Sequence, residues 1–207
     1  MTENPFIVRS SEPRDDAVIA SLVVEGFLDK FRPIFGSQMN RAVKIMEKWV
    51  GLEHSLGGVS SLVLEGPTPE EVKASVGVRI KGSDDDALAR ALWKVLRQNL
   101  GFMHACWAAT LLSYPRYAAT SSEAYIERLV VTREYRHQGM ARALLDAAES
   151  LARESGKETV GLHVSGSNLP ALRLYKAHGY EENSRQGSLL TGYFLDIREW
   201  LYLQKEL

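Results

Sequence analysis

The turn from Arg136 to Ala141 is the part of this sequence whose residue types and spacing are best suited to chemistry. It contains Arg136, His137, Gln138, Gly139, Met140 and Ala141. An apolar, strand-like segment precedes it, and a segment with helical periodicity, 139–153, follows it. The first N–H groups of a helix have no partner within the helix, so such a turn can bind phosphate groups. We therefore predict an anion site here, to which Arg136 adds a fixed charge.

The elements around this turn must hold it in place. β-Branched and alternating segments predict strands, and 3.6-residue periodicity predicts helices. The predicted strands are 6–9, 59–64, 74–80, 125–131, 159–164, 180–185 and 200–205. The predicted helices are 13–31, 39–50, two within 83–120, 139–153 and 170–178. A hairpin followed by alternating strands and helices predicts a mixed α/β sheet in one domain, 1–207, with 83–120 as a helical insertion.

Composition limits the class of protein. The 207 residues carry 25 Lys and Arg against 26 Asp and Glu, a formal net charge of −1. This balance gives no support for binding nucleic acid through a broad basic surface. The single cysteine, Cys106, cannot form an intrachain disulfide, which fits a reducing compartment. We therefore expect no nucleic-acid partner.

The sequence also predicts a soluble, cytoplasmic protein without a membrane partner. The most apolar run, 102–112, is much shorter than the roughly twenty residues that span a bilayer. Segment 1–14 is polar and does not resemble a signal peptide. The histidines have no spacing that indicates a metal site.

Further residues extend the motif of the turn. The pattern Arg136-x-x-Gly139-x-Ala141 follows Leu129-Val130-Val131, and Asn168 and Tyr175 come after it. This combination resembles the GCN5-related N-acetyltransferase (GNAT) superfamily, over about 125–182. The resemblance implies a mixed, mostly antiparallel twisted sheet with a central splay and flanking helices. It also implies acetyl-CoA as the co-substrate.

The resemblance assigns roles in binding that co-substrate. The backbone of Leu129, Val130 and Val131 would pair with the pantetheine arm. The turn and helix start would bind the pyrophosphate through Arg136, His137, Gln138, Gly139, Met140, Ala141 and Arg142. Asn168 matches an asparagine that contacts the cofactor, and it can also cap a helix. Tyr175 matches the tyrosine that protonates the departing CoA thiolate.

The implied reaction is direct attack by a primary amine on the thioester, which requires a base because such an amine is largely protonated near neutral pH. His163 is our candidate base, since imidazole titrates near neutral pH. Tyr125 and His163 also resemble the water-holding pair of certain protein N-terminal acetyltransferases. Glu127 is the alternative base or an orienting partner, and a water chain is a third route.

Two other functions stay open at this point. The chain could be a non-catalytic acyl-CoA-binding sensor, because it offers no single unambiguous carboxylate base. It could also be another nucleotide-phosphate binder, although the Walker and dinucleotide glycine patterns are absent. The expected acceptor is a small-molecule or peptide amine, shaped by segments 27–50, 83–120 and 184–197. The resemblance is also compatible with a homodimer.

Overall fold

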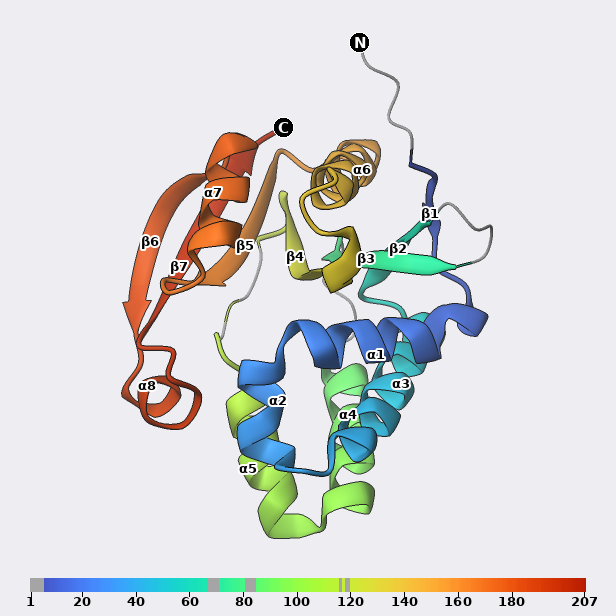
Figure 1. The fold of residues 1–207 in the computed structure, drawn as a ribbon, viewed down its shortest axis with the longest axis vertical. Helices are drawn as coiled ribbons and strands as arrows, with labels where there is room; N and C mark the ends of the chain where they lie inside the picture. The colour runs from blue at the N-terminus through green and yellow to red at the C-terminus, as the bar shows by residue number, and fades with distance from the viewer. Residues whose placement is uncertain (1–5, 67–70, 81–84, 116, 118–119) are drawn as a thin grey trace.

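A seven-stranded sheet forms the centre of the molecule in the computed structural model, which describes residues 6–66, 71–80, 85–115, 117 and 120–207 (Figure 1). The strand order is β1-β2-β3-β4-β5-β7-β6. The strands are β1 (Val8–Ser10), β2 (Ser60–Glu65), β3 (Val72–Arg79), β4 (Glu123–Val131), β5 (Thr159–Ser165), β6 (Glu181–Gly187) and β7 (Glu199–Glu206). This architecture confirms the predicted mixed sheet.

The sheet opens between β4 and β5, its only parallel neighbours among the described strands. Their pairing runs from Glu123 opposite Thr159 to Ile126 opposite Leu162 and stops there. β4 continues to Val131 and β5 to Ser165. The two strands therefore diverge over their second halves, which confirms the predicted splay.

A β-bulge lies in β4 at the point of divergence. Gly77 of β3 pairs with Arg128, whereas Val78 pairs with Ile126, so Glu127 is the additional residue. A bulge bends its strand and increases the local twist, and it can redirect a side chain. The bulge therefore places Glu127 at the opening of the sheet.

Two helical layers cover the sheet on opposite faces (Figure 1). α6 (Met140–Glu154) packs on β2, β3 and β4. α7 (Leu169–Ala177) shares with α6 a hydrophobic cluster that includes Leu144, Leu162 and Tyr175. On the other face, α1 (Asp16–Gly26) packs on β3 and β4 in a second cluster, which includes Val130. The sheet thus separates two cores.

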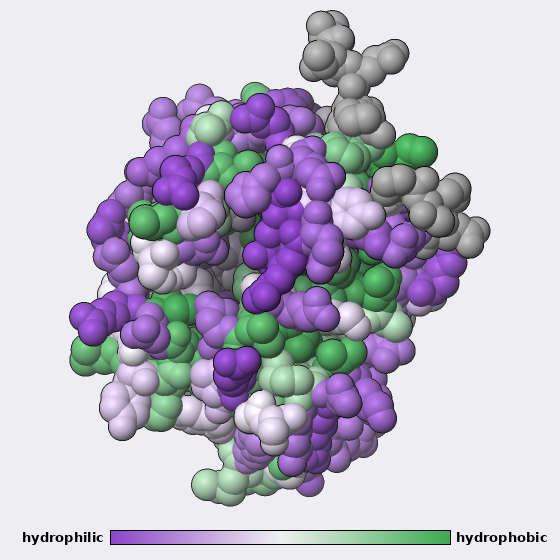
Figure 2. Space-filling model, viewed as in Figure 1, coloured by the Kyte–Doolittle hydropathy of each residue, from purple (hydrophilic) through white to green (hydrophobic). Residues whose placement is uncertain are grey.

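The helices beyond α1 form a compact layer below the sheet in this view (Figure 1). They are α2 (Leu28–Phe35), α3 (Met39–Leu56), α4 (Asp85–Leu100) and α5 (Phe102–Leu112). α4 and α5 lie between β3 and β4 in the chain, as predicted for 83–120, although residues 83, 84, 116, 118 and 119 lie outside the described set. In the same view, apolar surface residues gather at the level of α1 (Figure 2).

Several boundaries differ from those predicted. The predicted helix 13–31 is divided into a 3-10 turn, η1 (Pro13–Asp15), then α1 and α2, with a break at Phe27. α1 approaches β4 closely at Gly26, where an added Cβ would lie 2.6 Å from Val130 Cγ1. The second predicted helix, 39–50, continues to Leu56. α8 (Leu189–Leu195) is an additional helix that the sequence analysis missed, begun by Ser188, whose hydroxyl accepts from the Thr191 N–H.

The described part of the chain contains no helix that is both long and apolar enough to cross a membrane. Its His, Cys, Asp and Glu side chains also form no group of three or more that could hold a metal ion.

Candidate active site

A cavity of about 560 Å³ occupies the opening between β4 and β5. Its walls come from both diverging strands, the start of α6, α7, and the junction of α1 with α2. The cavity therefore reaches the predicted anion site at one end and the helical layer at the other. Nearly all the candidate residues named from the sequence line it.

The turn before α6 has the backbone that an anion site requires. A 3-10 turn, η2 (Arg133–Tyr135), precedes it, and both His137 (φ +63°) and Gly139 (φ +90°) adopt left-handed conformations. Gly139 is the N-cap of α6 and provides no side-chain cap, so no side chain competes for the first N–H groups. Glycine suits this conformation because it has no Cβ. The helix start is therefore available to a phosphate.

The side chains of the turn differ in direction. Arg136, His137, Gly139, Met140, Ala141 and Arg142 all line the cavity. Gln138 is the exception, because its amide Nε2 donates to the Glu134 carbonyl at 3.0 Å and it is absent from the lining. Arg136 Nε donates to the Val131 carbonyl at 3.2 Å, which ties the turn to the end of β4.

The second half of β4 offers a backbone edge to the cavity. Leu129, Val130 and Val131 pair with β3 on one side, opposite Val76, Ser75 and Ala74. On the other side, the pairing with β5 has already ended at Ile126, and all three residues line the cavity. An unpaired strand edge can bind an extended chain through main-chain hydrogen bonds. This geometry suits an extended ligand that carries amide groups.

α7 contributes Asn168 and Tyr175 to the opposite wall. Asn168 caps α7, since its Oδ1 accepts from the Ala171 N–H at 3.2 Å. Tyr175 is 8% exposed, and burial raises the pKa of its phenol to about 12. The phenol is therefore protonated at neutral pH and can act as a proton donor.

Tyr125 and His163 meet across the sheet opening. The Tyr125 hydroxyl and His163 Nδ1 share a hydrogen bond of 2.9 Å. Burial lowers the pKa of His163 to about 4, and the nearby charge of Lys30 lowers it further in the same direction. Burial also raises the pKa of Tyr125 above its usual range. Both groups are therefore neutral at physiological pH.

His163 therefore differs from the imidazole that we expect from the sequence, which would titrate near neutral pH. With a pKa of about 4, His163 has only the base strength of an ordinary carboxylate. It is, however, uncharged at every physiological pH and can always accept one hydrogen bond.

Glu127 lies at the rim of the same cavity. Its Oε1 accepts from Arg79 Nε at 2.6 Å, and the two side chains are 29% and 25% exposed. The carboxylate is thus fixed by a cation but still accessible. Because the bulge at Glu127 directs it to the opening, its position is compatible with proton transfer through water.

A network of tyrosine hydroxyl groups and one buried carboxylate lies beside Tyr125 and His163, and it was not predicted from the sequence. The Tyr117 ring stacks on Tyr125 at 5.1 Å and on Tyr202 at 4.7 Å between centroids. Its hydroxyl donates to Glu123 Oε2 at 2.6 Å, and the Tyr202 hydroxyl also donates to Glu123. A Cβ added at Gly161 would overlap the Glu123 carboxylate. No short motif marks these residues, because they come from a linker and three strands.

A buried ion pair fixes β4 from the side of the helical layer. Arg128 donates to both Glu53 carboxylate oxygens, at 3.0 and 2.5 Å, and to Ser61 Oγ at 3.1 Å. Trp49 Nε1 also donates to Glu53, at 3.0 Å. Removing one partner of such a pair leaves an unpaired buried charge, which is strongly destabilising. α3 and β4 are thereby held in fixed register beside the cavity.

Comparisons with known proteins agree with this geometry. The fold matches a solved structure described as an acetyltransferase, with a TM-score of 0.65 and 19% identity over 97% of this chain and 98% of that one. Ard1 from Thermoplasma volcanium matches with a TM-score of 0.60 and 17% identity over 99% of each chain. These similarities define the class of fold.

The sequence comparisons match part of this chain to one family. A model of the acetyltransferase (GNAT) family matches residues 83–180. GCN5-related N-acetyltransferase 4, chloroplastic, from Arabidopsis thaliana is 39% identical over 57 residues, which is 28% of this chain and 20% of that protein. The matched segment thus spans one fifth of the curated relative. Residues 83–180 thus match the GNAT acetyltransferase family, which confirms the resemblance seen in the sequence.

Proposed function

We propose that this protein transfers an acetyl group from acetyl-CoA to a primary amine. The observation that carries the proposal is a single cavity shared by an uncapped helix start, an unpaired strand edge, a protonated phenol and a neutral Tyr–His pair. The first two suit a phosphorylated, amide-containing co-substrate. The last two suit proton transfer at its reactive end.

The residues present fit acetyl-CoA in its extended form. We place the pyrophosphate at the start of α6, where N–H groups of residues 140–142 are free of a side-chain cap and Arg136 and Arg142 supply positive charge. We place the pantetheine arm along Leu129, Val130 and Val131. The thioester would then lie between Tyr175 and the Tyr125–His163 pair.

The chemistry is a direct transfer. The amine nitrogen attacks the thioester carbonyl carbon, a C–N bond forms and the C–S bond breaks. The sulfur leaves as a thiolate and takes a proton from the Tyr175 hydroxyl. The proton lost by the amine passes to His163, directly or through a water held by Tyr125, with Glu127 as the alternative acceptor. Positioned acids and bases of this kind contribute roughly 10²- to 10⁴-fold each.

The test is acetyl transfer measured as free thiol released from acetyl-CoA. We expect release that depends on the added amine, across a panel of small amines, amino acids and peptides. Mass spectrometry of the acceptor must show the added acetyl group. Tight acetyl-CoA binding without transfer to any acceptor would instead favour a non-catalytic acyl-CoA-binding module.

The cofactor positions are tested separately by Gly139→Glu. This change adds bulk and negative charge at the proposed pyrophosphate position, so acetyl-CoA should bind more weakly. Unchanged affinity by calorimetry would remove the helix start from the proposal. The cytoplasmic location and the homodimer remain predictions.

A further inference from the structure

Lys30 is a cation at the end of the cavity away from the anion site. It belongs to α2 and lines the cavity together with Phe27 and Trp200. Its Nζ donates to the Tyr114 carbonyl at 3.0 Å and lies 4.7 Å from the centroid of the Trp200 ring. The Phe27 ring centroid is 5.9 Å away. A backbone acceptor and two aromatic rings therefore define the position of the ammonium.

The charge of Lys30 has no carboxylate partner among the described residues. Asp29 and Glu127 act on it through space, but neither pairs with it, and Glu127 is paired with Arg79. An ammonium has three N–H donors, and only the bond to Tyr114 is formed within the described chain. Burial lowers the pKa of Lys30 to about 8, so it is still mostly protonated at neutral pH. A partly buried ammonium that leaves two of its three N–H donors without a partner among the described residues is costly unless an anion binds to it.

Lys30 is also close enough to the reactive centre to affect it. Its charge contributes to the lowered pKa of His163, after burial. The phosphates of the co-substrate are accounted for at the other end of the cavity, at Arg136 and the start of α6. The anion that Lys30 would bind therefore belongs to the acceptor.

We propose that Lys30 binds a carboxylate of the acceptor, so that the acceptor is an amine carrying a carboxylate nearby, as in an amino acid. This inference rests on the proposed acetyl transfer and narrows its substrate class. The carboxylate accepts the free N–H donors of Lys30, while Phe27 and Trp200 contact the apolar part of the acceptor. The amine then points toward His163 and Tyr125.

The test compares matched acceptors with and without the carboxylate. Free amino acids and their amides, such as glycine and glycinamide or phenylalanine and phenylalaninamide, are assayed with wild-type protein and with Lys30→Met. Methionine keeps the length of the stem and removes the charge. We expect the ratio of kcat/KM for acid over amide to fall about 10- to 100-fold in Lys30→Met, as for a lost charge-assisted hydrogen bond. Using the ratio cancels the different basicity of the two amines.

Two further variants serve as controls. Lys30→Arg retains the charge and should keep most of the preference for the acid. Lys44→Met removes an exposed lysine of α3 and should change neither acceptor. The KM for acetyl-CoA should be the same in all four proteins. An equal loss for acid and amide in Lys30→Met would overturn the inference.

A binding measurement separates this inference from the proposed function. N-acetylglycine and N-acetylglycinamide, as minimal products, are titrated by calorimetry into the protein saturated with CoA. Tighter binding of the acid that Lys30→Met abolishes supports the carboxylate site, even if no transfer is detected. Transfer to amines with equal binding of both products, or no binding of either, would overturn the site but leave the proposed function standing.

Discussion

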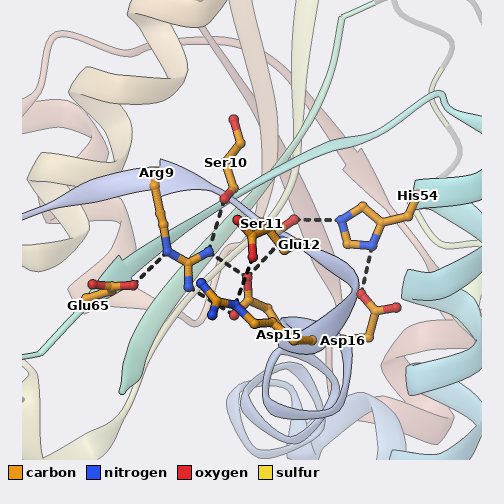
Figure 3. Close-up of polar contacts among 9 residues, drawn as sticks. Arg9, Ser10, Ser11, Glu12, Asp15, Asp16, His54 and Glu65 are labelled. Carbon is orange, nitrogen blue, oxygen red and sulfur yellow. Dashed lines mark hydrogen bonds and ion pairs between the residues drawn. The ribbon is translucent and has the colours of Figure 1, made fainter. Parts of the chain in front are cut away.

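Two histidines of this chain are each hydrogen-bonded to a hydroxyl group, yet they lie in very different surroundings. His163 meets the Tyr125 hydroxyl at 2.9 Å and lines the large cavity. His54 meets Ser11 Oγ at 2.7 Å through Nε2, and its Nδ1 lies 2.7 Å from Asp16 Oδ1 (Figure 3). In the second arrangement, a serine, a histidine and an aspartate lie in contact in that order, as in the catalytic triad of a serine hydrolase. Distances alone would favour His54 as the catalytic residue.

The surroundings of His54 favour a structural role. Ser11, Asp16 and His54 line neither the cavity in the sheet opening nor the smaller one beside α1. The contact of His54 with Asp16 is close but lacks the alignment of a hydrogen bond. The neighbouring cation, Arg9, is bound by Asp15 and Glu65 (Figure 3). His54 thus joins α3 to the chain before α1, and an accessible cavity is what distinguishes His163.

The largest expected effect separates the two histidines by activity. His163→Gln should lower kcat by about 10²- to 10³-fold, because the neutral acceptor at the reactive centre is displaced. His54→Gln should leave kcat unchanged per folded molecule, since it lies outside the cavity. Acetyl transfer measured at equal concentrations of folded protein checks both. Equal kcat in the two variants would remove the basis of the comparison.

The second-largest effect on activity is expected at Tyr175, on the cavity wall formed by α7. Tyr175→Phe removes the proposed proton donor to the thiolate, so kcat should fall by about 10²-fold with an unchanged KM for acetyl-CoA. Tyr193→Phe, a change at an exposed tyrosine of α8, is the matched control. If the two variants turn over equally, Tyr175 has no part in the reaction.

The pH dependence of activity sharpens the assignment of His163. Because its pKa is about 4, the neutral form predominates above pH 4 and is lost only below it. The kcat/KM profile of the wild type should therefore show no His163 transition between about pH 5 and pH 7. Comparison of wild type with His163→Gln across that range checks this. A transition near pH 6.5 that disappears in the variant would mean that His163 keeps an ordinary pKa.

We expect His54 to contribute to the stability of the fold and not to catalysis. His54→Ala removes the contacts with Ser11 and Asp16 and should lower the free energy of unfolding by about 1–2 kcal/mol. Denaturant unfolding followed by circular dichroism measures the change. Undiminished stability together with a large loss of kcat would reverse the roles of the two histidines.

The smallest effect concerns Arg9 beside His54. Hydrogen bonds from Arg9 hold the pKa of Asp15 below its ordinary value of 3.8, despite burial. The carboxylate form is favoured in the folded state, so this stability is present above the unfolded pKa and is lost as pH falls through the folded one. Arg9→Met should cost about 1 kcal/mol at neutral pH, and the difference should shrink below about pH 4. A difference that is constant with pH would contradict this linkage.

Sequence reasoning recovered the parts of this molecule that depend on local patterns. Gly139 and the periodicity after it predicted the turn and the helix α6, and alternation in 74–80 and 125–131 predicted central strands. The helix break at Phe27 was missed, because the close contact of Gly26 with Val130 is a tertiary constraint. α8 was missed because a seven-residue helix gives little periodicity.

Some features of the candidate site could likewise be predicted from local patterns, and others depend on tertiary contacts. The sequence predicts that Tyr125 and His163 lie close together, because their two strands are neighbours at the splay of the sheet. The hydrogen bond between the two side chains agrees with this prediction. The lowered pKa of His163 depends on burial and on Lys30, which is 133 positions away in the chain. Tyr117 and Glu123 were missed for the same reason, since side-chain networks between distant segments leave no pattern of spacing.

The two hydrophobic cores have a consequence for how this protein can change over evolutionary time. Trp200, on the acceptor side, belongs to the core of α1–α5 and Phe27 packs against that core, whereas Leu162, Val164 and Tyr175 belong to the core of α6 and α7. Because the sheet separates these cores, substitutions in the first can reshape one wall without repacking the other. Acceptor preference can therefore diversify while the half that we assign to acetyl-CoA stays intact.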